Sequence, residues 1–131
     1  MKHPQPIICS SDPAPDGIQN RAISIRQPYA EAILRGIKKI EYRSQPTRIR
    51  GRVYLYASLQ FGNVDLYPEL RDELEELPKG FLLGTVEIVA CYKLRYWNRP
   101  TEYEWHLANP ERLSVPLKPE RRPQPVWFKP F

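Results

Sequence analysis

Prolines restrict where this chain can form regular structure. Fifteen of the 131 residues are proline: four lie in residues 1–20, seven in residues 100–131, and only four in the seventy-nine residues between. Because proline lacks a backbone N–H and fixes φ, it is unfavourable in helix interiors and central strands. The sequence therefore predicts an ordered middle with irregular ends, and residues 1–20 are expected to be a disordered leader without a function of their own.

Length and hydrophobic content indicate one soluble domain, which we place at residues 21–128. A chain of 131 residues, 41% of them hydrophobic, buries one core but not two. No run approaches the ~18 apolar residues that cross a bilayer, and the first residues lack the apolar segment of a secretion signal. Cys9 and Cys91 form no metal-binding motif. We therefore expect a cytoplasmic monomer without a disulfide scaffold, a metal site or a cofactor.

Hydrophobic periodicity predicts short strands interrupted by two helices. One helix begins at Pro28, has Tyr29, Ile33 and Ile37 on its apolar face, and ends at Gly36. A second is expected from Val64 to Leu77, where leucines recur at helical spacing. Alternating residues predict strands at 21–26, 38–43, 52–58 and 81–92, and the C-terminal part is expected to hold a helical turn at 102–107 and brief strands at 113–117 and 126–128. This order favours an α+β domain with a curled, barrel-like sheet.

Positive charge is concentrated in one segment of the chain. The net charge is +5 and the isoelectric point is about 9.3, but residues 21–56 alone carry +7, from nine basic and two acidic residues. An excess of positive charge favours polyanionic partners such as nucleic acid. Aromatic rings interleave with the basic residues and are expected either to stack on bases or to pack under the helices; they belong to Tyr29, Tyr42, Tyr54 and Tyr56.

Three ionisable residues follow the first predicted helix at regular spacing. Gly36 is followed by Lys38, Glu41 and Arg43, and the last two lie two positions apart on a predicted strand, so they point to the same face. A lysine and an arginine side by side bind a phosphate or a carbonyl, and a carboxylate between them orients the cations or accepts a proton. The alternative is a surface cluster of salt bridges without a ligand.

The segment that contains these residues resembles the ASCH domain, a family with the PUA-like β-barrel fold. The resemblance covers roughly residues 21–128, and Gly84–Val86 and Trp105–Arg112 are similar to later family segments. It is carried by S-I-R-Q-P-Y-A from Ser24 to Ala30, by G-x-K-x-x-E-x-R from Gly36 to Arg43, and by R-G-x-x-Y-L-Y-A-S from Arg50 to Ser58.

The resemblance implies a fold and a site. The fold is a PUA-like β-barrel of about five to six mixed or antiparallel strands with two or three flanking helices. The site is a cleft between the barrel and the first helix, floored by the lysine, glutamate and arginine of the motif. Family members are associated with binding of RNA or single-stranded nucleic acid. Some small bacterial members hydrolyse acylated cytidine or cleave RNA, and in the amidohydrolase subgroup the motif lysine, here Lys38, is catalytic, whereas a threonine stands in place of Glu41.

Two hypotheses of different class follow. The first is a module that binds RNA or single-stranded nucleic acid, with Tyr29 and Ser58 in the cleft and a set of basic residues that attract phosphates: Arg26, Lys38, Lys39, Arg43, Arg48, Arg50 and Arg52. The second is a small hydrolase that acts on a modified nucleoside or an RNA phosphodiester. In it Lys38 acts as base or activates water, Glu41 tunes Lys38, and Ser58 or Arg43 holds the oxyanion.

Two further interpretations of the sequence have weaker support. A hydrolase would gain support from a second carboxylate on a facing strand, for which Glu87 is the candidate, although its alternation places it opposite the core. The acidic residues within 57–80 offer a contact for a protein partner, but they are also what any exposed helix face carries.

Overall fold

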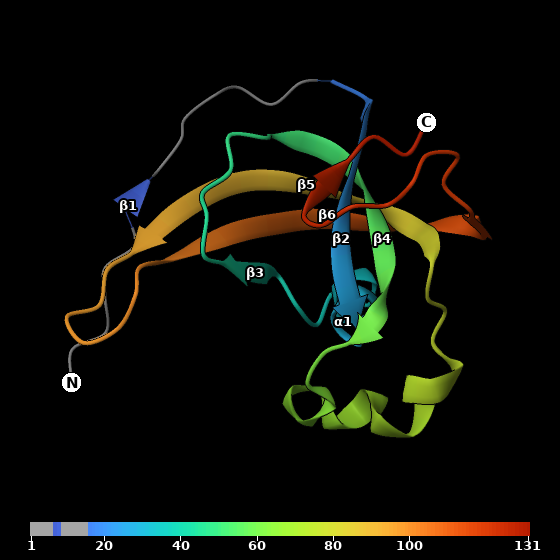
Figure 1. The fold of residues 1–131 in the computed structure, drawn as a ribbon, viewed down its shortest axis with the longest axis horizontal. Helices are drawn as coiled ribbons and strands as arrows, with labels where there is room; N and C mark the ends of the chain where they lie inside the picture. The colour runs from blue at the N-terminus through green and yellow to red at the C-terminus, as the bar shows by residue number, and fades with distance from the viewer. Residues whose placement is uncertain (1–6, 9–15) are drawn as a thin grey trace.

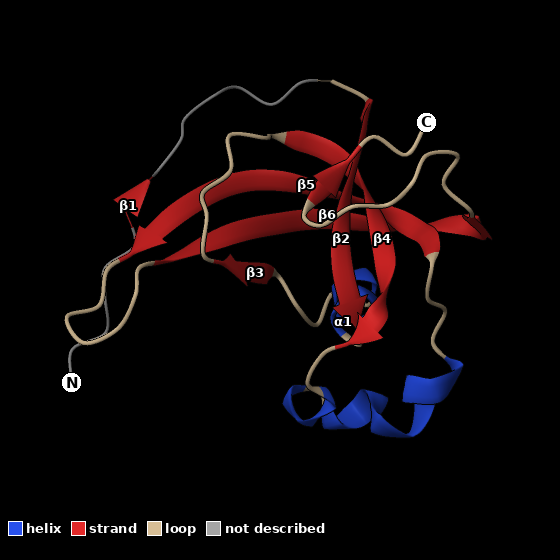
Figure 2. Ribbon diagram, viewed as in Figure 1, coloured by secondary structure: helices blue, strands red, loops and turns tan. Residues whose placement is uncertain are grey.

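Seven strands form one mixed, curled sheet in the computed structural model, which describes residues 7–8 and 16–131 (Figures 1 and 2). Six of them run in the order β3-β6-β5-β4-β2-β7, and β1 pairs with β5. Among the described strands, β2 and β4 pair in parallel and the other pairs are antiparallel. The strands are β1 (Ile7–Ile8), β2 (Ile18–Gln27), β3 (Ile40–Arg43), β4 (Gly51–Phe61), β5 (Phe81–Leu94), β6 (Glu102–Leu117) and β7 (Trp127–Phe128).

The curl of the sheet brings its two edges together. The long strands β5 and β6 bend across the molecule, and β2 and β4 cross them at a steep angle (Figure 1). β3 lies at one end of the strand order and β7, next to β2, at the other. The guanidinium of Arg43 on β3 donates to the carbonyl oxygen of Ser24 on β2 at 3.0 Å, and the rings of Trp105 and Trp127 stack at 5.8 Å. We call this junction the seam; it confirms the predicted barrel-like α+β architecture.

Helix α1 (Tyr29–Leu34) confirms the first predicted helix. Pro28 precedes it, and Ala30 and Ile33 on its inner face are buried in the core. Gly36 follows with φ of +77°, a left-handed conformation that glycine adopts without steric cost, so the chain reverses there toward β3. Ile37 lies beyond the helix and is 45% exposed, so it does not extend the apolar face as expected.

A buried carboxylate ties α1 to its neighbours. Glu31 accepts hydrogen bonds from both terminal nitrogens of Arg112 on β6, at 3.0 and 2.8 Å, and from Arg35 Nε at 2.7 Å. Arg35 also pairs with Glu73 at 2.9 Å. Burial alone would raise the pKa of Glu31, but the hydrogen bonds and charges of the two arginines outweigh it, so that this pKa lies below its usual value.

The second predicted helix is present but is not α-helical. Residues 64–77 form two short 3₁₀ helices, η1 (Val64–Leu66) and η2 (Pro68–Glu76). The leucine pattern is only partly used, since Leu70 and Leu77 are buried whereas Leu66 is 64% exposed. Pro68 lies in the first turn of η2, where proline is tolerated, and Pro78 follows the end of η2, so the two prolines bound this element.

The helical turn expected at residues 102–107 is wrong, whereas the strand expected at 113–117 is confirmed as the end of a longer one. A single strand, β6, covers residues 102–117, although it contains Pro110 and Pro116. Its pairing with β5 is irregular at both places: the register shifts between Ala108 and Glu111 and again between Arg112 and Leu117. β3 pairs only with residues 103–106 of β6, so the half of β6 that contains the two prolines has a free edge on the side of β3. Bulges and an unpaired edge accommodate residues that cannot donate a hydrogen bond.

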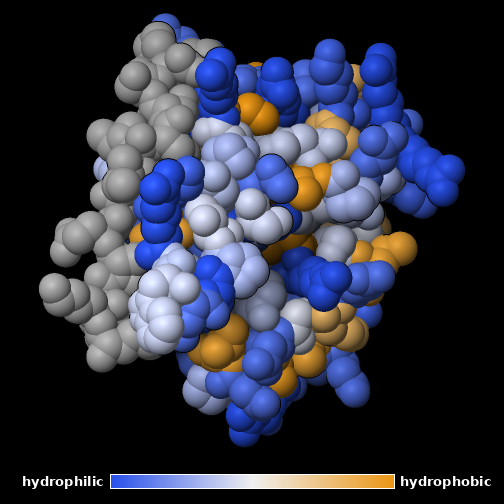
Figure 3. Space-filling model, turned by 60° about the vertical axis from the view of Figure 1, so that its left-hand side comes forward, coloured by the Kyte–Doolittle hydropathy of each residue, from blue (hydrophilic) through white to orange (hydrophobic). Residues whose placement is uncertain are grey.

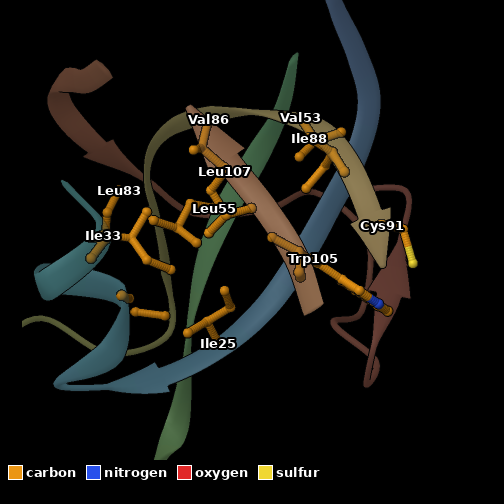
Figure 4. Close-up of a cluster of buried hydrophobic side chains, with 13 residues drawn as sticks. Ile25, Ile33, Val53, Leu55, Leu83, Val86, Ile88, Cys91, Trp105 and Leu107 are labelled. Atoms are coloured by element: carbon orange, nitrogen blue, oxygen red, sulfur yellow. The ribbon is translucent and has the colours of Figure 1, made fainter. Parts of the chain in front are cut away.

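The core lies inside the curl. Side chains from β2, α1, β4, β5 and β6 point toward one another, with Leu55 and Leu107 near the middle (Figure 4). Hydrophobic residues on one outer face form small, separate patches among hydrophilic ones (Figure 3). Among the described residues, no helix is long and apolar enough to cross a membrane.

Cys91 is part of this core, and its side chain is fully buried. The prediction about disulfides also involves Cys9 and therefore lies outside the described residues. Cys9 and most of the predicted leader lie outside the described residues, and β2 already begins at Ile18. The division into a leader and a domain at residue 21 stays a prediction.

Candidate functional site

A large hollow opens at the seam. It has a volume of about 630 Å³, within the range of about 300–1,000 Å³ that is typical of ligand sites. β3, at one edge of the sheet, and β2, next to the other edge, contribute residues, and α1, the end of β4 and the segment before β7 complete the wall. The lining residues are Ser24, Arg26, Tyr29, Glu41, Tyr42, Arg43, Tyr56, Ser58, Leu59, Gln60, Pro123, Gln124 and Pro125.

A charged triad lies at the wall of this cavity. Arg43 donates from Nε at 3.0 Å and from a terminal nitrogen at 2.6 Å to the same oxygen of Glu41. Lys38 Nζ lies 3.3 Å from the other oxygen and donates to the carbonyl of Ile40 at 2.6 Å. The carboxylate of Glu41 is only 7% exposed, against 10% for Lys38 and 23% for Arg43. The triad is therefore a mostly buried network and not the solvated surface cluster that the sequence left open.

Arg43 is held from three directions. Besides Glu41 it contacts Ser24 O across the seam and lies over the ring of Trp105, with 5.6 Å between the guanidinium carbon and the ring centre. A guanidinium has five N–H donors, and within the described residues those on Nη1 make no hydrogen bond. The side chain is thus fixed in place while part of its donor capacity remains for a ligand in the cavity.

Tyrosine rings surround the triad. Lys38 Nζ lies 5.5 Å from the ring centre of Tyr29 and 5.7 Å from that of Tyr42, distances at which cation and ring attract each other. The Tyr29 hydroxyl accepts a hydrogen bond from the N–H of Asn63 at 2.8 Å, and Gly62 packs so closely on this ring that a Cβ would overlap it. Tyr42 is 49% exposed, so its ring remains open to a partner.

Tyr67 is a neighbour that the sequence did not single out. Its ring meets that of Tyr29 edge to face at 6.0 Å. Burial raises the pKa of the Tyr67 hydroxyl, and the nearby negative charge of Glu41 raises it further, so this hydroxyl stays protonated. Tyr67 comes from the turn between η1 and η2, which no spacing rule connects to the triad.

The structure brings together part of the predicted binding set. Arg26, Tyr29, Glu41, Arg43 and Ser58 line the cavity. Lys38 adjoins it through Glu41, and with Lys39 it lines a separate hollow of about 230 Å³ on the other side of the turn at Gly36.

The remaining predicted arginines lie elsewhere. Arg50 is buried, and its guanidinium donates to the carbonyls of Thr47 and Ile49. Arg52 donates to Thr85, to the Asn109 carbonyl and to Glu87. Arg48 is exposed but lines none of the three hollows. The contacts of Arg50 and Arg52 hold strands and loops together, because the Arg50 guanidinium closes a turn and the Arg52 guanidinium bridges segments that are distant in the chain.

The second carboxylate sought on a facing strand is not near the triad. Glu87 pairs with Arg52 at 3.2 Å and accepts from Asn109, and its side chain is 35% exposed. Within the described residues, no group of three or more histidine, cysteine, aspartate or glutamate side chains is placed to hold a metal ion.

One wall of the cavity comes from residues 123–125, which lie in the C-terminal part that the sequence predicted to be irregular. Ser24 Oγ donates to the carbonyl of Gln124 at 2.9 Å, and Ser24 N donates to that of Val126 at the same distance. These bonds hold the segment from Pro123 to Pro125 against β2. The proline content of this segment predicts an extended chain, but no signal in the sequence predicts where it docks.

Comparisons with known proteins identify the family. A family model described as the ASCH domain matches residues 23–117. The chain belongs to the ASCH-domain family. This segment contains the triad and most of the sheet, so the motif-based resemblance and its PUA-like fold are confirmed.

The ASCH domain has relatives among characterised chains and solved structures. It is 32% identical over 125 residues to activating signal cointegrator 1 of Homo sapiens and, equally, to that of Mus musculus. Each match covers 80% of this chain but only 21% of the relative, so the chain spans about a fifth of those proteins. The crystal structure of ASCH from Zymomonas mobilis superposes with a TM-score of 0.59 at 14% identity, covering 83% of this chain and 85% of that one. At this identity the likeness shows the fold alone.

Proposed function

We propose that this ASCH domain binds RNA or another single-stranded nucleic acid in the cavity at the seam. The observation that carries the proposal is the combination of Arg26 and Arg43 with the rings of Tyr29 and Tyr42 in one cavity of about 630 Å³. Guanidinium groups recognise phosphate oxygens, and aromatic side chains provide stacking faces for unpaired bases. Such a wall suits a nucleotide whose base is splayed out of a helix.

The two arginines would contribute differently. Arg43 is oriented by Glu41 and Ser24 and would hold one phosphate in a fixed geometry. Arg26 is exposed on β2 and forms no ion pair among the described residues, so its charge is free to attract phosphates from solution. Family resemblance adds support, since ASCH members are associated with RNA or single-stranded nucleic acid.

Catalysis has less support than binding. Lys38 Nζ donates to the Ile40 carbonyl at 2.6 Å and lies beside the Glu41 carboxylate, and Lys38 is not among the residues that line the cavity. A general base must reach the proton that it removes, and a lysine must also offer a free lone pair. We therefore propose a binding module and not a hydrolase.

The test uses Arg26→Gln, because Arg26 is exposed and its loss leaves the triad intact. Arg95→Gln, an exposed cation beyond β5, is the matched control. Binding of a labelled oligouridine is followed by fluorescence anisotropy between about 50 and 200 mM salt, where each phosphate contact to a single strand contributes about −0.7 to the slope of log K against log salt. Arg26→Gln should make that slope shallower by about 0.7 and weaken binding about threefold to tenfold, whereas the control should not.

Two outcomes would contradict the proposal. Affinity that does not change with salt would mean that phosphates are not the groups recognised. Shortening of the RNA or deacylation of an acylated cytidine in the same samples, lost in Lys38→Ala, would show the enzyme activity instead.

A further inference from the structure

A second hollow continues from the cavity at the seam. It has a volume of about 490 Å³, and its wall includes Tyr56, Leu59 and Pro123, which also line the first cavity. Three shared residues make the two hollows neighbours on one surface. The second one extends from there between the turn before β5 and the segment that follows β6. We call it the lateral groove.

Unpaired positive charge distinguishes the lateral groove. Lys79 from the turn before β5 and Lys118, Arg121 and Arg122 from the segment after β6 line it, together with a single acidic residue, Glu120. None of these four cations forms an ion pair among the described residues. By contrast, Arg35, Arg43 and Arg52 in the basic segment 21–56 all pair with carboxylates. Available positive charge therefore lies in the groove as well as in the segment where the sequence concentrates it.

Both sides of the groove are anchored. The N–H groups of Glu120 and Arg121 donate to the carbonyl of Pro130 at 2.8 and 3.1 Å, which fixes the loop that carries three of the cations. Gly80 N donates to the Ala57 carbonyl at 2.6 Å, which holds the turn that carries Lys79 against β4. A charged surface that is already ordered loses less entropy when a ligand binds.

Apolar side chains accompany the cations. Leu59 is 71% exposed between the two hollows, and Phe81 in the groove is 37% exposed. Lys79 Nζ lies 3.8 Å from the ring centre of Phe61, itself 39% exposed. Alternating cations and apolar faces suit a single-stranded nucleic acid, which presents phosphates and base faces along one chain. An acidic peptide would offer no flat faces for these rings.

We propose that the lateral groove binds the sugar-phosphate backbone of the same nucleic-acid strand whose base occupies the cavity at the seam. This inference rests on the proposed function. The strand leaves the cavity over Tyr56 and Leu59 and places its next phosphates near Lys118, Arg121 and Arg122. The cavity then selects a nucleotide, and the groove makes affinity depend on the length of the strand.

The test compares two ligands and two variants. The ligands are labelled oligouridines of about three and about ten nucleotides, since only the longer one reaches beyond a single cavity. The groove variant combines Lys118→Gln, Arg121→Gln and Arg122→Gln. The control variant combines Lys93→Gln, Arg95→Gln and Arg99→Gln at and near the turn between β5 and β6, at the other end of these strands from the groove (Figure 1).

We expect the groove variant to bind the longer ligand at least about tenfold more weakly at 0.15 M salt, with a salt slope shallower by about two, because three phosphate contacts are lost. Its affinity for the shorter ligand should change less than about twofold, and the control should match the wild type with both ligands. Circular dichroism checks that both variants keep the wild-type fold.

Three outcomes overturn the inference. If the groove variant binds the longer ligand as the wild type does, or the control loses as much affinity, the groove is not the contact surface. If the wild type binds both lengths equally well, the proposed function stands but the groove has no part in it. If the wild type binds neither ligand, the proposed function itself fails.

Discussion

Replacement of Glu41 by glutamine tests the triad directly. The substitution keeps the shape of the side chain but removes the negative charge that lies between two cations. Arg43 loses two charge-assisted hydrogen bonds to one carboxylate oxygen, at 2.6 and 3.0 Å, and Lys38 loses a partner at 3.3 Å. Because the carboxylate is 7% exposed, water replaces little of what is lost.

The expected destabilisation is about 2–4 kcal/mol. A hydrogen bond to a charged group contributes about 1.5–3 kcal/mol, and breaking a buried ion pair costs about 3–5 kcal/mol. The expected value lies toward the lower end of the cost of breaking a buried ion pair, because Arg43 is 23% exposed and glutamine still offers one acceptor. With an unfolding entropy of about 2.1 cal/mol/K for each of the 131 residues, this corresponds to a Tm lower by about 7–14 °C.

Glu87→Gln is the matched control. Glu87 also pairs with an arginine, Arg52 at 3.2 Å, but its side chain is 35% exposed, and exposed pairs contribute about 0–1 kcal/mol. Thermal and urea unfolding give the stabilities, and anisotropy gives the affinity for oligouridine. Glu41→Gln should melt well below Glu87→Gln and bind oligouridine more weakly than the wild type, because Arg43 loses the carboxylate that orients it. Equal melting of the two variants would refute the argument from burial, and unchanged binding by folded Glu41→Gln would refute the role of Glu41 in orienting Arg43.

Two further predictions concern the fold. The pKa of Glu31 is lowered in the folded state, so its ion pairs contribute fully to stability above the usual carboxyl pKa of about 4.5. This contribution is lost as the pH falls through the pKa of the folded state. Urea unfolding from pH 7 to 3 should therefore show a smaller loss of stability for Glu31→Gln than for the wild type. Gly84→Ala should cost about 1–3 kcal/mol in the same assay, since a Cβ there overlaps the Glu111 carbonyl and Leu34, whereas unchanged stability would show that β6 shifts freely.

Local sequence patterns predicted those strands and helices that are determined by residues close together in the chain. Alternation located β2, β3, β4 and β5, and Gly36 marked the end of α1 because a left-handed residue is needed there. The same reasoning missed that residues 102–117 form one continuous strand. Proline is excluded from a strand only where its N–H would be needed, and the bulges and free edge that remove this need depend on the partner strands.

The candidate site was predictable only within its motif. Spacing on one strand placed Glu41 and Arg43 on the same face, and Lys38 lies beside them. The sum of charges over residues 21–56 was a weaker guide, because it counts Arg50 and Arg52, which hold the fold, equally with Arg26, which lines the cavity. Whether a cation is paired depends on contacts between distant segments, and composition does not contain that information.

The wall formed by residues 123–125 has a consequence for how such a domain diversifies. The ASCH family model ends at residue 117, so the triad and most of the sheet lie inside the shared region, while this wall and three cations of the lateral groove lie after it. The hydrogen bonds of Ser24 fasten this wall to β2, while β7 and the buried ring of Phe128 anchor the chain that follows it. Exchange of residues 118–125 would therefore change what the cavity accepts while β7 keeps its place in the sheet, which makes this segment the place where one scaffold can acquire different ligands.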